Sequence, residues 1–305
     1  MLKKIAPGST ISVIAPAYPP NPEKTELGIT YLESKGYEVV RNESLKGNHG
    51  YFSAPDEQRI KELNESFANP NVDAIICARG GWGNLRLLDK IDYKTIKQNP
   101  KLLVGYSDIT TLQLAIWQKC EIPSISGPMV AVEMASGILD FTEKYFWEQI
   151  DNPEKNYSIN LAEIGTENWN DGQSHGTLLG GCLSMVAHQL GTPYSPNYDG
   201  SILFIEDVGE VPYKIDRYLA QMKQAGILDS ISGLIIGEFL DCESDDEDSF
   251  SVEEILHDYF DNLKCPVIYN FPYGHGMKKI SMPIGSKTSL DTKKGKLEFE
   301  NIFNS

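Results

Sequence analysis

Hydrophobic runs alternate with amphipathic stretches along the first half of the chain. Short apolar runs that end at Gly, Pro or polar residues are typical of strands in a parallel sheet, and apolar residues at helical spacing are typical of the helices between them. This alternation predicts a doubly wound parallel α/β sheet, with functional residues at the carboxyl ends of its strands. The predicted strands lie at about 10–15, 37–41, 72–78, 102–106 and 122–125, and the predicted helices at about 23–35, 55–67, 84–88, 108–118 and 141–149.

The pattern changes near residue 151, where the polar segment DNPEKN (151–156) is a predicted linker. A chain of 305 residues also exceeds the usual size of one core. We therefore expect two domains, an N-terminal α/β domain at 1–155 and a smaller C-terminal α/β domain at 156–305. Beyond the linker, the apolar pattern predicts strands at about 201–205, 233–239 and 266–269, helices at about 183–190, 213–224 and 252–263, and a hairpin within 286–299.

The stretch from Lys101 to Gln118, KLLVGYSDITTLQLAIWQ, combines a short buried strand with a helix and places Ser107 at the corner between them. A hydroxyl at such a corner projects from the carboxyl edge of the sheet, and the backbone N–H groups that follow, starting with that of Asp108, point outward without partners. This geometry suits a nucleophile beside an oxyanion pocket. Ser and Asp are also favoured N-cap residues, so helix capping alone is the alternative from this stretch.

A glycine-rich segment, RGGWG at 79–83, follows the predicted strand at 72–78. Turns of this kind bring backbone N–H groups close to an anion or an oxyanion. The glycines are not in the GxGxxG register of dinucleotide-binding loops. The segment therefore indicates a tight turn or half of an oxyanion hole, with phosphate binding as a further alternative.

Two later segments carry groups for acid–base chemistry. Glu206 and Asp207 follow the predicted strand at 201–205, and His275 lies between two glycines in FPYGHGM. Flanking glycines add little bulk, so this histidine is free to reach into a cleft. Ser107, Glu206 and His275 could form a triad in which the imidazole takes the serine proton and the carboxylate orients the ring. A solvated loop start is the alternative for the acidic pair.

Composition limits the partners that we expect. No apolar run approaches the ~18 residues that a membrane span needs, and Pro7 and Gly8 interrupt the N-terminal apolar patch, which favours a first strand over a signal peptide. The formal charge of −16 argues against a nucleic-acid-binding surface. The five cysteines include no CxxC pair, which favours the reducing cytoplasm over a disulfide framework or a zinc site.

Four segments of the chain resemble the LD-carboxypeptidase family of serine peptidases. They are, in order, ARGGWG (78–83), GYSDIT (105–110), LFIEDVGEVPYKIDR (203–217) and PYGHG (272–276). The matches cover most of the chain, and their combination is specific although each motif alone is not. The resemblance implies an N-terminal parallel α/β domain with a smaller C-terminal domain, commonly in a homodimer, and no metal or other cofactor.

The resemblance also implies a reaction. Ser107 would be the nucleophile, His275 the general base and Glu206 the carboxylate that orients the base. The usual reaction of the family removes the terminal D-alanine from murein tetrapeptides during cell-wall recycling, by hydrolysis of the amide between an L-configured centre and D-Ala. The expected partner is therefore a small peptide substrate.

Further residues take expected roles from the same resemblance. The backbone N–H groups of Asp108 and Gly81 would form the oxyanion hole, with Gly80 as the alternative to Gly81. A carboxypeptidase must hold a free carboxylate, and Arg79 is a candidate because a guanidinium binds carboxylates bidentately, although a structural role is the alternative. Where the family commonly has Gly-Gly-Asn-Leu, this chain has Cys182 in place of Asn. If that Asn supports the site in the family, the substrate preference of this chain stays open.

Two other functions stay open from the sequence. A related branch of the family, the microcin C self-immunity peptidases, cleaves acyl-sulfamoyl adenylates or their peptide precursors, and Trp82 or Trp169 could stack on such a base. A non-catalytic module that binds a phosphate or a peptide carboxylate at the Gly-rich loop is the alternative from another class. The combination of Ser107 with His275 favours the enzyme, because a binding module has no need of both.

Overall fold

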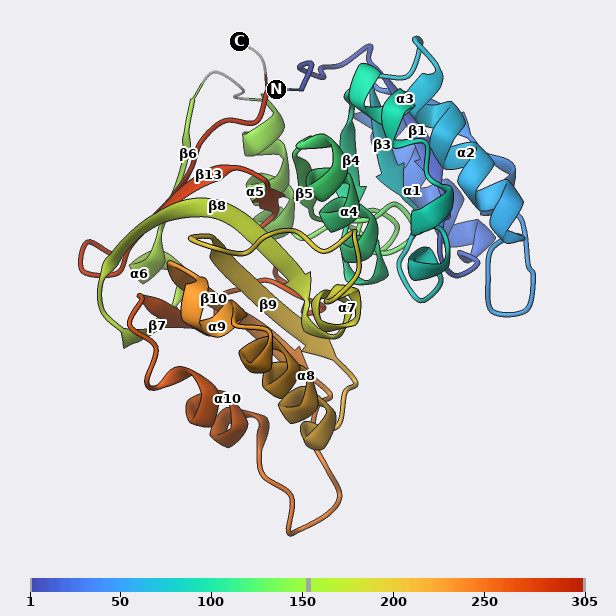
Figure 1. Ribbon diagram of the computed structural model, residues 1–305. Coiled ribbons are helices and arrows are strands. Elements are labelled where there is room, and N and C mark those ends of the chain that lie inside the picture. Colours follow the sequence, from blue (N-terminus) through green and yellow to red (C-terminus); the bar gives the residue numbers. More distant parts are fainter. Residues whose placement is uncertain (1, 152–154, 304–305) are drawn as a thin grey trace.

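In the computed structural model, which describes residues 2–151 and 155–303, a six-stranded sheet forms the centre of the first half of the chain (Figure 1). Its order is β12-β5-β4-β3-β1-β2, and all neighbours are parallel except β12, which pairs antiparallel with β5. The doubly wound parallel sheet is therefore confirmed. Its strands are β1 (Thr10–Ile14), β2 (Glu38–Arg41), β3 (Ala74–Cys77), β4 (Leu102–Gly105), β5 (Ser124–Ser126) and β12 (Met282–Ile284).

Helices flank this sheet (Figure 1). They are α1 (Pro22–Ser34), α2 (Asp56–Ala68), α3 (Tyr93–Gln98), α4 (Thr110–Cys120) and α5 (Asp140–Asp151). The predicted helix at about 84–88 is wrong, because two 3-10 turns, Asn84–Arg86 and Leu88–Lys90, occupy this segment. The first of these turns is held from outside by the carboxylate of Asp108, which accepts a hydrogen bond from the backbone of Asn84.

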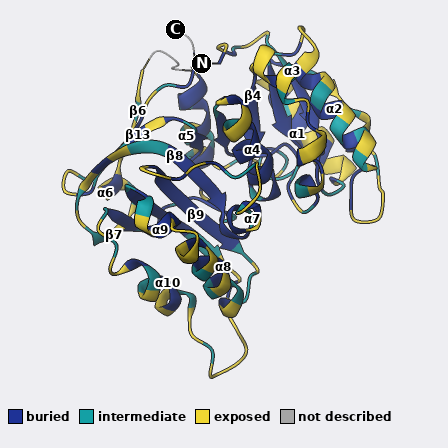
Figure 2. Ribbon diagram, viewed as in Figure 1, coloured by how far each residue is buried: buried dark blue, intermediate teal, exposed yellow. Residues whose placement is uncertain are grey.

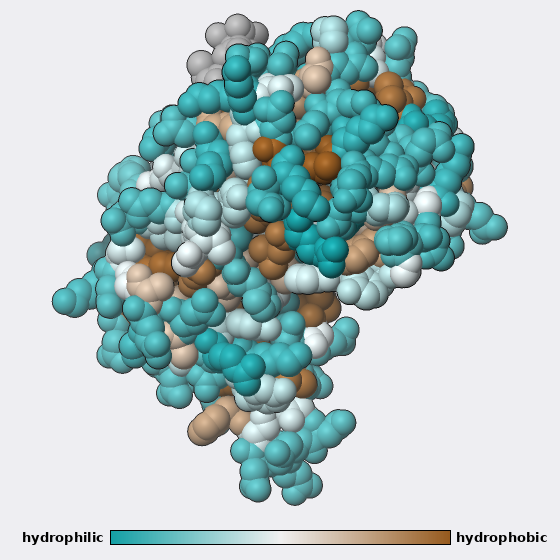
Figure 3. Space-filling model, turned by 45° about the vertical axis from the view of Figure 1, so that its right-hand side comes forward, coloured by the Kyte–Doolittle hydropathy of each residue, from teal (hydrophilic) through white to brown (hydrophobic). Residues whose placement is uncertain are grey.

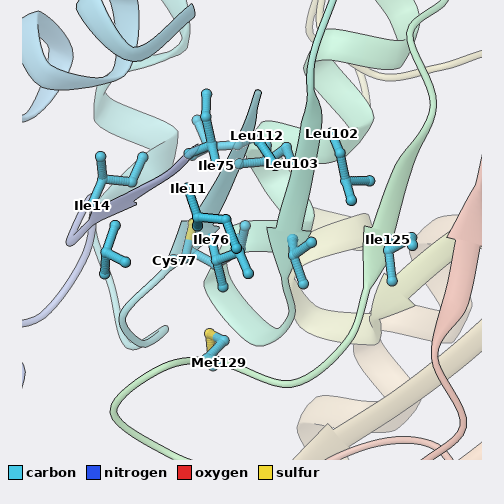
Figure 4. Close-up of a cluster of buried hydrophobic side chains, with 14 of the residues drawn as sticks. Ile11, Ile14, Ile75, Ile76, Cys77, Leu102, Leu103, Leu112, Ile125 and Met129 are labelled. Atoms are coloured by element: carbon cyan, nitrogen blue, oxygen red, sulfur yellow. The ribbon is translucent and has the colours of Figure 1, made fainter. Parts of the chain in front are cut away.

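Continuous apolar runs form the core of the first sheet. All four residues of β3 and of β4 are buried, as expected for strands covered on both faces. Burial of each aliphatic side chain stabilises the fold by roughly 1.5–3 kcal/mol. Figure 4 shows the packed side chains, with labels on Ile11, Ile14, Ile75, Ile76, Cys77, Leu102, Leu103, Leu112, Ile125 and Met129.

A second, eight-stranded sheet follows in the order β6-β14-β13-β8-β9-β10-β11-β7. Neighbours from β8 to β11 are parallel, and the outer strands pair antiparallel. The strands are β6 (Tyr157–Asn160), β7 (Glu167–Asn170), β8 (Gln173–Cys182), β9 (Ile202–Val208), β10 (Gly233–Leu240), β11 (Val267–Tyr269), β13 (Lys287–Asp291) and β14 (Lys296–Phe299). The accompanying helices are α6 (Leu161–Ile164), α7 (Leu183–Gln189), α8 (Pro212–Gln224), α9 (Ile227–Ser230) and α10 (Val252–Phe260).

The two halves of the chain exchange elements. Strand β12 belongs to the first sheet although it lies late in the sequence, and Ile302 and Phe303 pack into the first core. Leu114 of α4 packs in turn into the core of the second sheet. Of the predicted linker at 151–156, residues 152–154 lie outside the described part of the chain, so the division at residue 155 stays a prediction.

Helix α4, which begins just after the Ser107 corner, lies between the two sheets and is buried from Thr110 to Ile116 (Figure 2). The hydroxyl of Thr110 accepts a hydrogen bond from the backbone N–H of Cys182 (3.3 Å), and the carbonyl of Thr111 accepts one from the side chain of Gln189 (2.7 Å). The corner is therefore fixed at the junction of the two sheets.

Polar side chains cover most of the face seen in Figure 3, and several apolar patches lie in its middle, between the upper and lower parts of the molecule. Within the described ranges, the chain has no helix that is long and apolar enough to cross a membrane.

Candidate active site

Ser107 lies at the carboxyl end of β4, where the sequence predicts it, in a 3-10 turn at Ser107–Ile109 that leads into α4. Its φ of +64° is in the left-handed region, which non-glycine residues rarely adopt. Such local strain is held by the surrounding structure and is common at functional sites, including the strand-to-helix turns that present nucleophiles. The side chain is half-buried, and its hydroxyl has no hydrogen-bond partner in the part of the chain that the structure describes.

The carboxylate of Asp108 is buried and binds the segment after the Gly-rich loop. Its Oδ2 accepts hydrogen bonds from the backbone N–H of Asn84 (3.1 Å) and from its side-chain amide (2.7 Å). Burial raises the pKa of Asp108 to about 6, although these hydrogen bonds oppose the shift. Capping of α4 is therefore the wrong interpretation of this side chain, and its backbone N–H begins the 3-10 turn without a partner inside that turn.

The Gly-rich loop touches the Ser107 corner, because β3 and β4 are neighbours in the sheet. A Cβ added to Gly80 would lie 2.9 Å from the Cβ of Ser107 and 3.1 Å from its Oγ, so only glycine fits at this distance. Gly81 is exposed, and its N–H donates no hydrogen bond within the described residues. The loop thus brings an unused backbone donor close to the serine.

Arg79 and Trp82 are half-buried residues of the same loop. The guanidinium of Arg79 lies 5.6 Å from the ring centroid of Tyr18, and its buried Nε finds no hydrogen-bond partner in the ranges that the structure describes. Arg79 forms no ion pair in the described part of the chain. Among the described residues, this acidic protein thus keeps a cation without a counter-ion in the loop that touches the serine corner.

Glu206 and His275 are hydrogen-bonded to each other. Glu206 is fully buried in β9, and its Oε2 accepts a hydrogen bond of 2.8 Å from Nδ1 of His275. Donation from Nδ1 leaves Nε2 as the acceptor on the other side of the ring. A Cβ on Gly274 would lie 2.8 Å from this carboxylate oxygen, which explains the glycine before the histidine. The solvated loop start is therefore wrong for Glu206 and also for Asp207, which is buried beside it.

The imidazole of His275 lies next to the serine's own segment. The ring of Tyr106, the residue before Ser107, packs edge-on against it with centroids 5.1 Å apart. A cavity of about 310 Å³ opens on this side of the histidine. It is lined by Val132, Glu133, Ser136, Gly137, Ile138, Leu139, His275, Gly276 and Met277.

Cys182, at the position where Asn is usual, is buried at the start of α7. Its Sγ lies 3.4 Å from Oδ1 of Asp207, whose Oδ2 accepts a hydrogen bond from the backbone of Ser184 (2.7 Å). Burial raises the pKa of the Cys182 thiol well above its ordinary value, so it stays protonated and is no rival nucleophile. Burial also raises the pKa of Asp207 to about 6.

The structure does not bring Trp169 to this group of residues. Trp169 lies on β7, the outer strand of the second sheet, and stacks on His257 (4.0 Å between centroids) and Tyr269 (4.4 Å). The described residues include no cluster of His, Cys, Asp and Glu side chains that could hold a metal ion.

Two residues near the site, Glu133 and Lys279, carry no recognisable signal in the sequence. Lys279 is 2% exposed and forms an ion pair with Glu133, which also accepts a hydrogen bond from the hydroxyl of Tyr106 (2.8 Å). Each lies in a loop without a recognisable motif, so only the fold brings them together.

An elbow serine at the end of one sheet and a carboxylate-bound histidine that packs on the neighbouring Tyr106 are the groups that hydrolases with an activated serine use. Family models agree with this class: the LD-carboxypeptidase N-terminal domain matches residues 11–127 and the LD-carboxypeptidase C-terminal domain matches residues 175–290. The chain belongs to the LD-carboxypeptidase family of serine peptidases.

Relatives of the chain carry two kinds of name. It is 36% identical to a probable murein peptide carboxypeptidase from Bacillus subtilis, over 95% of this chain and 91% of the relative. It is 28% identical to the microcin C7 self-immunity protein MccF from Escherichia coli, over 94% of this chain and 92% of the relative. Among solved structures, muramoyltetrapeptide carboxypeptidase from Oxalobacter formigenes superposes with a TM-score of 0.85 at 33% identity, covering 95% of this chain and 98% of that one.

Proposed function

We propose that this protein is a serine carboxypeptidase that releases the terminal D-alanine from murein tetrapeptides by hydrolysis of the L,D amide bond. The hydrogen bond between His275 and Glu206, beside the segment that carries Ser107, is the observation on which the proposal rests. The names of the relatives in Bacillus subtilis and Oxalobacter formigenes support the choice of substrate.

In the proposed mechanism, Ser107 attacks the carbonyl carbon of the scissile amide while Nε2 of His275 takes the hydroxyl proton. Glu206 holds the imidazole by its Nδ1–H and stabilises the imidazolium that forms. The imidazolium then gives its proton to the nitrogen of D-alanine, the C–N bond breaks, and an acyl-enzyme remains. Water, activated by the same histidine, hydrolyses the ester and restores Ser107.

We assign the oxyanion hole to the backbone N–H groups of Asp108 and Gly81. Neither donates a hydrogen bond to another described residue, and both flank the serine corner. Preorganised donors of this kind contribute roughly 3–4 kcal/mol each to stabilisation of the transition state. The buried hydrogen bonds from Asn84 to the carboxylate of Asp108 tie the segment after the Gly-rich loop to the serine corner.

We assign the terminal carboxylate of the substrate to Arg79. Its guanidinium has no protein counter-ion among the described residues and lies beside the loop that forms the proposed oxyanion hole. A free carboxylate would supply the missing acceptors in a bidentate pair. Trp82, in the same loop, is a second candidate for substrate contact, whereas the packing of Trp169 on β7 leaves it out of the proposal.

The test is mass spectrometry of the purified protein incubated with a murein tetrapeptide, beside the Ser107→Ala variant. We expect loss of one D-alanine with the wild type, and a rate at least 10³-fold lower with Ser107→Ala although the peptide still binds. Cleavage of an acyl-sulfamoyl adenylate with no release of D-alanine would contradict the proposed substrate and favour the self-immunity branch. Equal loss of binding and turnover in Ser107→Ala would instead favour a binding module.

We further propose a homodimer that acts in the cytoplasm during cell-wall recycling, built from domains at 1–155 and 156–305. Two separate hydrophobic cores support the division into domains, although each core takes a few residues from the other half. The dimer, the location and the recycling role rest on the family resemblance. Light scattering of the purified protein would measure the oligomeric state, with a monomer as the contradicting result.

A further inference from the structure

We propose that Lys279 is a positioning residue, which fixes the His275 loop against the nucleophile segment through Glu133 and Tyr106. The inference deepens the proposed function and rests on it, since His275 must be the base that serves Ser107. It concerns a side chain outside the triad, at the junction of the two sheets.

The side chain of Lys279 is buried, and its ammonium contacts Glu133 and Tyr106. The side chain is 2% exposed, its ammonium forms an ion pair with Oε1 of Glu133, and the same nitrogen lies 3.8 Å from the ring centroid of Tyr106. The hydroxyl of Tyr106 donates to the same carboxylate oxygen (2.8 Å), and the backbone N–H of Met129 donates to the other (2.9 Å). The cluster therefore satisfies both oxygens of the carboxylate and gives the ammonium a counter-ion and an aromatic face.

These contacts join three segments whose relative positions matter for the proposed mechanism. Tyr106 directly precedes Ser107, and its ring packs against the imidazole of His275. Glu133 lines the cavity beside that imidazole, and Lys279 lies four residues after His275 in the same loop. A shift of the ammonium would therefore move the ring on which the histidine rests, together with the loop that carries it.

The rest of the loop is held at its two ends and by Thr142, whose hydroxyl accepts a hydrogen bond from the backbone N–H of Lys279 (3.1 Å). The hydroxyl of Tyr273 is hydrogen-bonded to Ser126 (2.7 Å), and the backbone N–H of Ile280 donates to the carbonyl of Pro272 (2.7 Å), which closes the loop. Beyond it, β12 pairs with β5 of the first sheet. These bonds anchor the loop without fixing the position of His275 within it, whereas the Lys279 cluster makes contact with the histidine through Tyr106.

A charge pair with a buried ammonium is an expensive way to hold a loop, since the cost of desolvation offsets much of the attraction between the charges. The pair does, however, fix the orientation of the Lys279 side chain, because the ammonium must face both the carboxylate and the ring. Burial and the carboxylate of Glu133 raise the pKa of Tyr106 well above its ordinary value, which keeps its hydroxyl protonated and donating. The cluster is therefore suited to setting a geometry.

The experiment compares Lys279→Met with Lys101→Met. Lys101 is a matched control, because it is also buried (8% exposed), donates to the backbone carbonyls of Ser66 and Asn69, and lies at the opposite end of β4 from Ser107. The first readout is the rate at which a fluorophosphonate labels Ser107, which reports activation of the serine without a peptide substrate. The second is the separation of kcat from KM for release of D-alanine. Thermal melts measure the folded fraction of each variant.

We expect Lys279→Met to label and to turn over 10- to 100-fold more slowly per folded molecule, with KM within about threefold of wild type, because a misplacement of about 1 Å costs that much in rate. Lys101→Met should melt at a lower temperature and keep the wild-type labelling rate. Equal labelling rates for the two variants would overturn the inference even if the wild type releases D-alanine. A wild type that neither releases D-alanine nor is labelled would overturn the proposed function, and this inference with it.

Discussion

The serine side and the histidine side of the site are built in opposite ways. Ser107 is placed by one continuous stretch, a buried strand that ends at Gly105 and a turn that forces the serine to a positive φ. His275 is placed by contacts between distant segments: its partner Glu206 lies 69 positions earlier, and its loop is fastened to the first sheet by β12. Local sequence thus determines the first arrangement, and tertiary packing determines the second.

This difference predicts how substitutions on each side should affect the site. Substitutions at the serine side should alter the geometry of a rigid, strained corner, and they should do so over short distances. Substitutions on the histidine side should alter the orientation of a ring that is held by its neighbours. Substitutions on each side can therefore separate the two effects.

Glu206→Gln should have the largest effect on kcat, and it acts on the histidine side of the site. An amide in place of the carboxylate cannot stabilise the imidazolium, and it favours the wrong tautomer of His275, so kcat should fall roughly 10³- to 10⁴-fold. Steady-state kinetics of D-alanine release measures this. Asp207→Asn is the neighbouring control, because Asp207 bonds to Ser184 instead of the histidine, and its loss should cost less than about tenfold. Similar losses in both variants would contradict the assignment of Glu206.

Gly80→Ala should disturb the geometry of the serine side of the site. The new Cβ would lie 2.9 Å from the Cβ of Ser107, so either the loop or the corner must move, and kcat should fall about 10- to 100-fold. Gly172→Ala is the control, because the added Cβ would come no closer than 3.3 Å to its neighbours, at Cδ of Pro266, in the turn between β7 and β8. The ratio of kcat values measures the effect. Wild-type kcat in Gly80→Ala would show that the loop does not constrain the nucleophile.

Asp108→Asn should have the smallest effect on rate and a defined effect on the pH dependence of stability. Burial raises the pKa of Asp108 to about 6 from an ordinary value of 3.8, so the folded state retains a proton that the unfolded state has lost. The contribution of this group to stability is therefore complete below pH ~4 and declines as the pH rises through about 6. In the variant, which cannot ionise, this decline of roughly 2–3 kcal/mol should be missing.

Urea denaturation of both proteins between pH 4 and pH 7 measures that difference. Asp207, whose pKa burial also raises to about 6, is common to both proteins, so its contribution cancels. Parallel stability curves for wild type and Asp108→Asn would contradict the assignment of a buried, ionisable carboxyl at this position. The retained hydrogen bonds to Asn84 should keep kcat within a few-fold of wild type.

The same contrast explains what the sequence could and could not predict about the fold. The first sheet follows from apolar runs, because strands buried on both faces are recognisable without their neighbours. Strand β12 has only three residues and belongs to the sheet of the other half, so no local pattern assigns it. The prediction of a helix at 84–88 was wrong for a related reason, since a distant carboxylate, that of Asp108, holds this segment as a 3-10 turn.

The residues of the candidate site also divide into those that local sequence indicates and those that only the fold brings together. Ser107 follows from the strand-to-helix corner, and the glycines around His275 indicate a histidine that needs room. Lys279 and Glu133 carry no such signal, because a buried ion pair becomes visible only when its two loops are packed together. Trp169 shows the limit of a local signal: an aromatic residue in a polar, glycine-containing stretch suggests a ligand, and this role stays a prediction because the structure shows only its stacking on Tyr269.

The most direct test of the central claim, that the two sheets supply one catalytic site, is to map the residue that a fluorophosphonate modifies in the wild type and in His275→Ala. Peptide mass spectrometry should find the adduct on Ser107 in the wild type, and the rate of labelling should fall at least 100-fold in His275→Ala because the serine loses its base. An adduct on another serine, or an unchanged rate of labelling without the histidine, would contradict the account.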